Sequence, residues 1–189
     1  MAQIRHIAIQ TQDEEATKRF YVENLGLKVV RKLESERTSG YFLTDGHINL
    51  AILRFKNDVV AGAERGTGWS GIHHIGFQVD DLEEAAAKLE KSGAAKPRDD
   101  INVALGLGAG GAPAGHGNVE VRYIGPDNVN FDISQTGWLG TPSNKAHDKR
   151  IIDEHEEIFD ALVRRDSDAA REKVRKHIES LRNNVRNQL

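Results

Sequence analysis

The chain has 189 residues with 38% hydrophobic content and a formal net charge of -3. This size supports one solid core and a small additional element, and the charge favours neither nucleic acid nor an anionic membrane as a partner. Because the chain has no cysteine, any metal ion must take nitrogen and oxygen ligands. No apolar run reaches the ~20 residues that cross a bilayer, and no signal peptide precedes the first strand pattern, so we expect a cytoplasmic protein.

The N-terminal part predicts a strand, a helix and three further strands. Residues 4–10 alternate as a strand, and Asp13 to Leu25 has helical spacing with Gly26 as its C-terminal cap. Residues 27–33 alternate again, and an Asp-Gly turn at 45–46 joins two more predicted strands, 40–43 and 48–55. These elements form a first module, residues 4–56, which the loop 57–71 separates from the rest.

The same order begins again at residue 72. The segment Ile72-His73-His74-Ile75-Gly76-Phe77 repeats Ile4-Arg5-His6-Ile7-Ala8-Ile9, so His6 and His74 occupy equivalent positions. A second helix is predicted from Asp81 to Lys91, and the last strands are predicted at 119–123 and 129–134. Residues 72–135 therefore form a second module, and residues 1–138 form one domain.

A glycine-rich segment, residues 104–118, interrupts the second module. A phosphate-binding loop is rejected there because the segment lacks the Gly-Lys-Ser/Thr ending and no helix pattern follows it. A mobile hairpin loop or lid is expected instead, since glycine gives the backbone freedom.

The C-terminal part predicts a linker, residues 139–147, and then a helical hairpin, residues 148–189. The first helix carries an apolar stripe, Ile151, Ile152, His155, Ile158, Phe159 and Leu162, and Asp166-Ser167-Asp168 supplies an N-cap for a second helix over 169–185. Such a stripe has to be covered by the main domain or by a partner chain. We therefore expect a homodimer.

Several motifs in this order resemble the vicinal oxygen chelate superfamily, which includes glyoxalase I, extradiol dioxygenases, epimerases and bleomycin-resistance proteins. They are His6-Ile7-Ala8-Ile9, Phe20-Tyr21, Leu25-Gly26-Leu27, His74-Ile75-Gly76-Phe77 and the closing Gly125-Pro126-Asp127-Asn128 with Asp132. The resemblance covers residues 4 to about 138. It implies an α+β fold in which two βαβββ modules form a curled mixed sheet around a cleft.

The resemblance also implies a metal site. Carried onto this sequence, the four ligand positions of the family fall on His6, Ala51, His74 and Asp132, three of which can bind a metal ion. Asn49, on the same strand face as Ala51, is the alternative for the fourth position. Two imidazoles and one carboxylate leave coordination positions open and suit Fe, with Mn, Co, Ni or Zn as alternatives.

The resemblance implies an enzyme that acts on a small, vicinally oxygenated substrate as a lyase, an isomerase or a dioxygenase. Glu120, Arg122 and Tyr123 precede Asp132 and are the candidate base and anion-binding groups. A non-catalytic binding protein, of the resistance or sensor kind, is the alternative. His73 is expected to point to the opposite strand face from His74. His47 and His116 are expected in solvent, with a contact to substrate as the alternative.

The hairpin resembles the last two helices of the ligand-binding domain of FadR-type GntR regulators, the FCD domain. Glu154-His155, Ile158, Ala161-Leu162, Asp166, Ala169-Ala170 and His177 carry this resemblance. In those regulators the histidines that match His155 and His177 bind a metal ion. For this chain we expect a packing or dimerisation element, with a second metal or effector site as the alternative.

Overall fold

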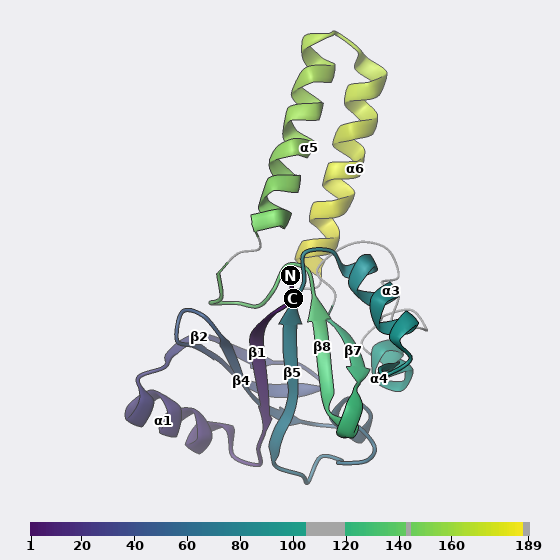
Figure 1. Ribbon diagram of the computed structural model, residues 1–189. Helices are drawn as coiled ribbons and strands as arrows, with labels where there is room; N and C mark the ends of the chain where they lie inside the picture. The colour runs from purple at the N-terminus through teal and green to yellow at the C-terminus, as the bar shows by residue number, and fades with distance from the viewer. Residues whose placement is uncertain (105–119, 143–144, 187–189) are drawn as a thin grey trace.

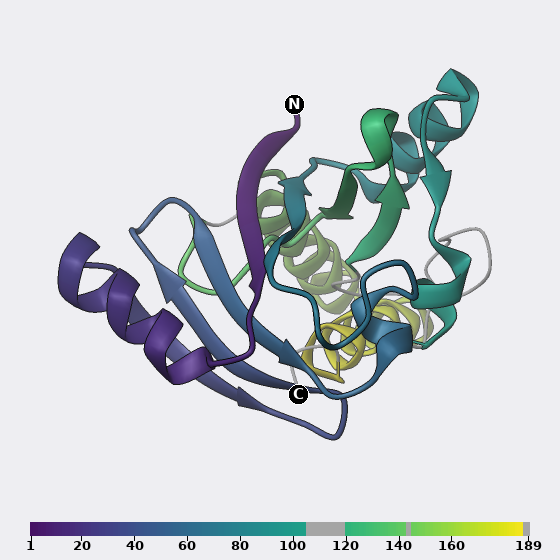
Figure 2. The same ribbon diagram turned by 90° about the horizontal axis from the view of Figure 1, so that it is seen from below.

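The computed structural model describes residues 1–104, 120–142 and 145–186, without the side chains of 145–151 and 180–186. Its main body is one mixed sheet of eight strands in the order β2-β3-β4-β1-β5-β8-β7-β6 (Figure 1). Seen from below, the sheet curls strongly but does not close (Figure 2). The expected α+β architecture with a curled mixed sheet is confirmed.

The first module contains β1 (Gln3–Gln10), α1 (Glu14–Leu25), β2 (Lys28–Glu34), β3 (Thr38–Thr44) and β4 (Asn49–Phe55). Helix α1 begins after Asp13 because the Asp13 carboxylate accepts a hydrogen bond from the Ala16 amide at 2.9 Å. It ends at Gly26, whose φ of 72° suits glycine. The predicted order of elements and the predicted start and end of the helix agree with the structure of this module.

The second module contains β5 (Gly71–Gln78), α3 (Leu82–Ser92), β6 (Lys96–Pro97), β7 (Val121–Ile124) and β8 (Asn130–Ser134). It departs from the first module because β6 has only two residues and is followed by a short helix, α4 (Asp99–Ala104). Another short helix, α2 (Asp58–Ala61), lies in the predicted loop between the modules. Except for its first residue, the glycine-rich segment 104–118 lies outside the described residues.

The two modules join edge to edge, because β1 pairs antiparallel with β5. Each of these strands also pairs in parallel with the last strand of its own module, β4 or β8. Direct pairing therefore aligns one row of residues across five strands: Asn49, His6, Gly76, Asp132 and Arg122. Neighbours in such a row project to the same face of a sheet, so this row gathers polar side chains on the concave face.

The apolar residues divide between the two faces of the sheet. Beneath α1, the convex face buries Tyr41, Leu43, Leu50 and Ile52, and beneath α3 it buries Val79, Leu82, Val121, Tyr123 and Ile133. Full burial of one such large side chain contributes about 1.5–3 kcal/mol. These two clusters fix the sheet to its helices, whereas the concave face holds the polar row together with a third apolar cluster that includes Ala8, Ala51 and Phe55.

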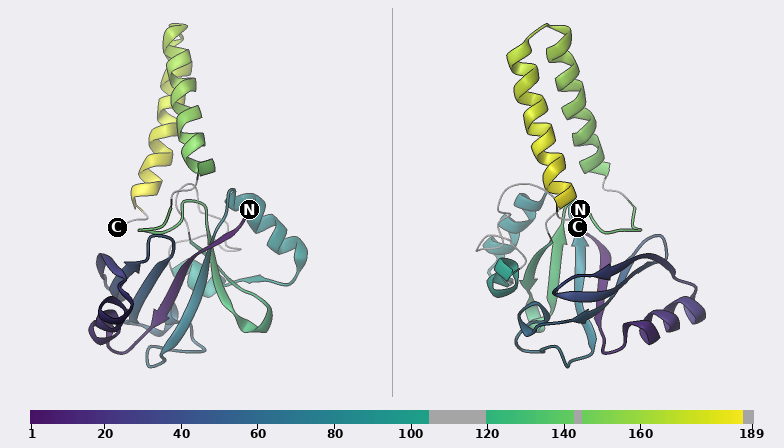
Figure 3. Two further views of the ribbon diagram at one scale, coloured as in Figure 1. Left: turned by 60° about the vertical axis from the view of Figure 1, so that its left-hand side comes forward. Right: turned by 180° about the vertical axis from the view of Figure 1, so that it is seen from behind.

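The C-terminal hairpin consists of α5 (Lys145–Val163) and α6 (Ser167–Arg186), which pack on each other and project away from the sheet (Figures 1 and 3). The Asp166 carboxylate caps α6, accepting a hydrogen bond from the Ala169 amide at 3.0 Å. Ile152, Phe159 and Leu162 of the predicted stripe are exposed, and the Ile151 side chain is outside the described residues. No helix in the described part of the chain combines the length and hydrophobicity of a bilayer-spanning segment.

Candidate functional site

The structure brings the three proposed metal ligands together in the middle of the concave face. His6 Nε2 lies 3.1 Å from His74 Nε2, and His74 Nε2 lies 3.3 Å from Asp132 Oδ2. All three side chains are buried, with 1–3% of each residue exposed. His6 comes from β1, His74 from β5 and Asp132 from β8, so the site exists only when the two modules pair.

Arg122 of β7 completes this cluster. Its Nε and Nη2 each donate to one carboxylate oxygen of Asp132, both at 2.7 Å, and Nη2 also lies 3.2 Å from His74 Nε2. Burial opposes the guanidinium charge, but Asp132 more than offsets this effect and raises the pKa of Arg122. Arg122 is therefore a charged partner of the site residues.

The separations between the donor atoms fit a shared metal ion. Two donors about 2.1 Å from one ion and at about 90° to each other lie about 3.0 Å apart. The measured separations of 3.1 and 3.3 Å are close to this value. However, no group of three or more histidine, aspartate or glutamate side chains in the described residues is already arranged to hold a metal ion. In addition, Arg122 Nη2 contacts His74 Nε2. An ion would have to displace this contact.

The two histidines are neutral at physiological pH. Burial lowers the pKa of His6 from its usual 6.5 to about 4, although Asp132 and Asn49 act in the opposite direction. Burial also lowers the pKa of His74 well below 6.5, and the nearby Arg122 charge adds to this effect. Neutral imidazole is the form that binds a metal ion.

Glu120, the candidate base, lies just before β7. Burial raises the pKa of its carboxyl group from 4.5 to about 7, and the negative charge of Asp132 adds to this rise. Arg122 and Trp138 act in the opposite direction and offset part of it. A carboxyl group with this pKa can both accept and return a proton near neutral pH.

The structure does not bring Tyr123, the third catalytic candidate, to this cluster of side chains. Successive side chains of a strand point to opposite faces, and β7 places Arg122 on the concave face. Tyr123 is buried in the core beneath α3 and stacks on Phe131, with ring centroids 5.6 Å apart. Burial raises the pKa of its hydroxyl group.

Of the two candidates for the fourth ligand position, only Asn49 carries a donor atom near the site. Ala51 is fully buried in an apolar cluster and has no donor atom. Asn49 pairs directly with His6 in the sheet, and its Oδ1 lies 2.9 Å from His6 Nδ1. In this arrangement Asn49 contacts the ring atom of His6 that faces away from His74.

His73 is also part of the cluster, and the expectation that it points away from His74 is wrong. Ala8 pairs with His74 but Ile9 pairs with Ile72, so His73 is the extra residue of a β-bulge. The bulge breaks the alternation, and His73 Nδ1 lies 2.7 Å from His74 Nδ1. A repeat of alternating residues gives no sign of such an insertion.

Residues 135–142 form a strap that crosses from β8 to the first module. Gly140 O accepts a hydrogen bond from Thr44 Oγ1 at 2.7 Å, and Leu139 O accepts one from Asn49 Nδ2 at 2.8 Å. The strap also places Trp138 on His6, with the rings nearly parallel and their centroids 4.9 Å apart. A Cβ at Gly76 would come within 2.6 Å of Trp138, so glycine is required there. Sequence reasoning assigned Trp138 to no site.

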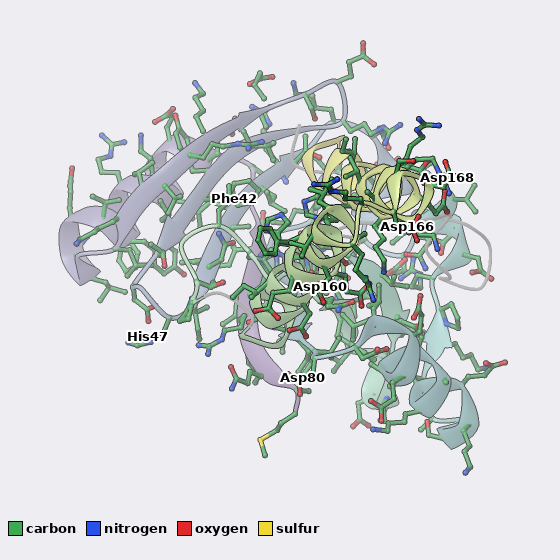
Figure 4. All side chains as sticks on the ribbon, turned by 90° about the horizontal axis from the view of Figure 1, so that it is seen from above. Phe42, His47, Asp80, Asp160, Asp166 and Asp168 are labelled. Atoms are coloured by element: carbon green, nitrogen blue, oxygen red, sulfur yellow. The ribbon has the colours of Figure 1, made fainter. Side chains whose placement is uncertain are left out.

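The other histidines lie elsewhere. His47 is exposed at the rim of the molecule (Figure 4), and His116 lies outside the described residues. In the hairpin, His155 Nε2 and His177 Nε2 are 2.9 Å apart, and His177 Nδ1 lies 2.9 Å from a Glu154 oxygen. Two cavities, of about 490 and 500 Å³, are lined by residues other than the site histidines and carboxylates.

Comparisons with known proteins agree with the fold and with both family resemblances. The family model described as Glyoxalase/Bleomycin resistance protein/Dioxygenase superfamily matches residues 3–117, and the FCD domain model matches residues 132–180. Among curated proteins, the uncharacterized protein YwkD of Bacillus subtilis (strain 168) is 32% identical over 95 residues. That match covers 48% of this chain and 71% of YwkD.

Three solved structures show the same fold at low identity. The hypothetical protein BH1468 from Bacillus halodurans C-125 has a TM-score of 0.55 at 19% identity, covering 73% of this chain and 96% of that one. A methylmalonyl-CoA epimerase in complex with methylmalonyl-CoA and NH4+ has a TM-score of 0.52 at 21% identity, covering 75% and 99%. A variant of the Streptomyces coelicolor methylmalonyl-CoA epimerase in complex with 2-nitronate-propionyl-CoA has a TM-score of 0.51 at 21% identity, covering 70% and 96%.

Proposed function

We propose, starting from the fact that this chain belongs to the Glyoxalase/Bleomycin resistance protein/Dioxygenase superfamily, that it is a metal-dependent enzyme acting on a small oxygenated substrate. His6, His74 and Asp132 bind the divalent ion, which is Fe, Mn, Co, Ni or Zn. The observation that carries the proposal is the convergence of these three buried side chains at separations of 3.1 and 3.3 Å.

The reaction supported best is removal of a proton beside a carbonyl group, as in an isomerase or a lyase. Glu120 is the base, because its pKa of about 7 leaves a large carboxylate fraction at neutral pH. The C–H bond breaks, its proton moves to Glu120, and its electron pair shifts onto the carbonyl oxygen as an enolate. A bound divalent ion would supply the positive charge that stabilises this oxygen.

In an isomerase, Glu120 then returns the proton to the carbon atom. The pKa of about 7 favours this step, because a carboxyl group that titrates near the working pH can both take up and release a proton. Arg122 holds Asp132 in place through two hydrogen bonds. Its role is to fix the direction of the carboxylate that binds the ion.

A metal-free binding protein is the second candidate, and Arg122 is the observation that favours it. Its guanidinium already contacts both Asp132 and His74, so a positive charge is present without an ion. In that case the concave face would bind an anionic small molecule and carry out no reaction. The ion content of the protein separates the two candidates.

The first experiment is therefore elemental analysis of protein purified without chelators, followed by addition of each of the five ions to stripped protein. The enzyme proposal predicts near-stoichiometric metal and a higher melting temperature with at least one ion. Metal-loaded protein is then incubated in D2O with methylmalonyl-CoA, because two of the structural neighbours are methylmalonyl-CoA epimerases. The incorporation of deuterium at the α-carbon is measured. Failure of all five ions to bind or stabilise the protein would favour the binding-protein candidate.

A further inference from the structure

The Nδ1 atoms of His6 and His74 each make a hydrogen bond that decides which ring nitrogen carries the proton. A neutral imidazole carries one proton, so a proton on Nδ1 leaves a lone pair on Nε2, and the reverse. The hydrogen-bond partners of Nδ1 therefore decide whether Nε2 can bind an ion. In this chain the partners are Asn49 for His6 and His73 for His74.

The proton of His6 is fixed by Asn49. The Asn49 Nδ2 group donates to the carbonyl oxygen of Leu139 at 2.8 Å, so the Asn49 Oδ1 atom is the one that faces His6 Nδ1 at 2.9 Å. An amide oxygen only accepts hydrogen bonds. His6 therefore carries its proton on Nδ1, and its Nε2 lone pair points into the site.

The proton of His74 is fixed through His73. The Ala61 carbonyl oxygen lies 2.9 Å from His73 Nε2 and requires a proton there. The neutral His73 ring then has its lone pair on Nδ1, which accepts from His74 Nδ1 at 2.7 Å. His74 thus also carries its proton on Nδ1, so its Nε2 lone pair faces that of His6 across 3.1 Å.

We propose that Asn49 and His73 are positioning residues that hold His6 and His74 in the Nδ1-protonated form and so direct both Nε2 lone pairs at one cation position. This inference rests on the proposed function for the identity of the cation, but not for the proton positions. Arg122 Nη2, which can only donate, lies 3.2 Å from His74 Nε2 and agrees with a lone pair on that atom; a bound cation would take the place of this contact. Each positioning residue is itself fixed by a backbone carbonyl group, of Leu139 or of Ala61.

The proton positions can be measured directly in metal-free protein. In a protein labelled with 15N-histidine, nitrogen shifts and long-range couplings to the ring protons distinguish a protonated nitrogen from one with a lone pair. The wild type should show Nδ1–H for His6 and His74 and Nε2–H for His73. An Nε2–H signal at either His6 or His74 would overturn the inference, whatever the metal content of the protein.

Variants test whether the two residues control the ion. Asn49→Leu and His73→Leu remove the hydrogen-bond acceptors at nearly constant size and should weaken Co2+ binding about 10- to 100-fold. His73→Asn keeps an oxygen near the position of Nδ1 and should restore most of the affinity and the Nδ1–H signal of His74. Thr11→Val, which removes a buried hydroxyl next to β1, is the control and should change neither measurement.

The outcomes separate this inference from the proposed function. If the wild type shows the expected proton positions but binds no Co2+ by calorimetry or visible absorbance, the tautomer assignment is supported and the metal role fails. If the wild type binds Co2+ and both leucine variants, folded by circular dichroism, bind it equally well, the metal role stands and the positioning role is overturned. Should the leucine variants unfold, the wild-type spectrum and the His73→Asn protein still decide the question.

Discussion

Arg122 and Asp132 form a two-pronged ion pair inside the sheet, with both N···O distances at 2.7 Å. Both side chains are almost fully buried. A buried charge that loses its partner destabilises a protein far more than the intact pair stabilises it. The pair also lies where a bound ion would act, so a change to Arg122 affects stability and ion binding together.

Arg122→Leu should lower the free energy of unfolding of the metal-free protein by about 3–5 kcal/mol, because it leaves Asp132 buried and unpaired. Co2+ should restore more stability to this variant than it adds to the wild type, since the ion takes over the role of the guanidinium. Urea unfolding with and without Co2+ measures both effects. Lys88→Leu is the control, because the side chains of Lys88 and its partner Glu84 are 73% and 65% exposed and such surface pairs contribute about 0–1 kcal/mol.

Glu120→Gln should reduce the rate of α-proton exchange about 10²- to 10⁴-fold while Co2+ affinity is retained, because the amide cannot accept the proton. In the wild type the exchange rate should rise as the pH passes about 7, where Glu120 loses its proton. Tyr123→Phe, three residues along but on the opposite face, should leave the rate unchanged. An exchange rate in the glutamine variant equal to that of the wild type would remove Glu120 from the reaction.

Stability should fall as the pH is lowered from about 6.5 towards 4. The pKa values of His6 and His73 are about 4 in the folded protein and about 6.5 unfolded, so the unfolded chain binds more protons in this window. The raised pKa of Glu120 has the opposite effect on stability between pH 4.5 and 7. The lowered pKa of His74 adds to the effect of the other two histidines. Urea unfolding at several pH values measures the slope. A constant or rising free energy of unfolding on acidification would contradict the neutral, buried histidines.

The hairpin should mediate a homodimer through its exposed apolar side chains. Phe159 and Val163 are each 65% exposed and lie one helical turn apart on α5. Replacing both with glutamate should weaken self-association at least tenfold, because each charge would have to be buried at the interface. Sedimentation velocity over a concentration series measures this. Val59→Glu, at an apolar position in α2 that is 53% exposed, is the control. A dimer equally stable in both proteins would show that the hairpin does not form the interface.

Much of the fold was predictable because each module repeats local signals. Aspartates cap α1 and α3, and glycines with positive φ end both helices. The irregular second module was less predictable. Its second strand is only Lys96–Pro97, because proline has no amide proton for a strand ladder and α4 begins two residues later.

The site was predictable where strand register alone decides it. His6 and His74 begin equivalent patterns, and the pairing of β5 with β8 brings Asp132 to them. The contributions of His73 and Trp138 were not predictable. One depends on a bulge in β5, and the other depends on the strap folding back over His6. Neither event leaves a periodic signal in the sequence.

The open ends of the curled sheet also bear on how the protein avoids aggregation. An unclosed sheet exposes two edge strands, here β2 and β6, whose free backbone groups can recruit another chain. Lys28, Arg31 and Lys32 place positive charges along β2, so a second copy approaching this edge meets like charge. At the other end, β6 is too short to act as a template, and Pro97 removes one of its few donors. The two edges are thus protected by different means. Charge repulsion protects β2, and β6 offers too few backbone hydrogen bonds for another strand to pair with it.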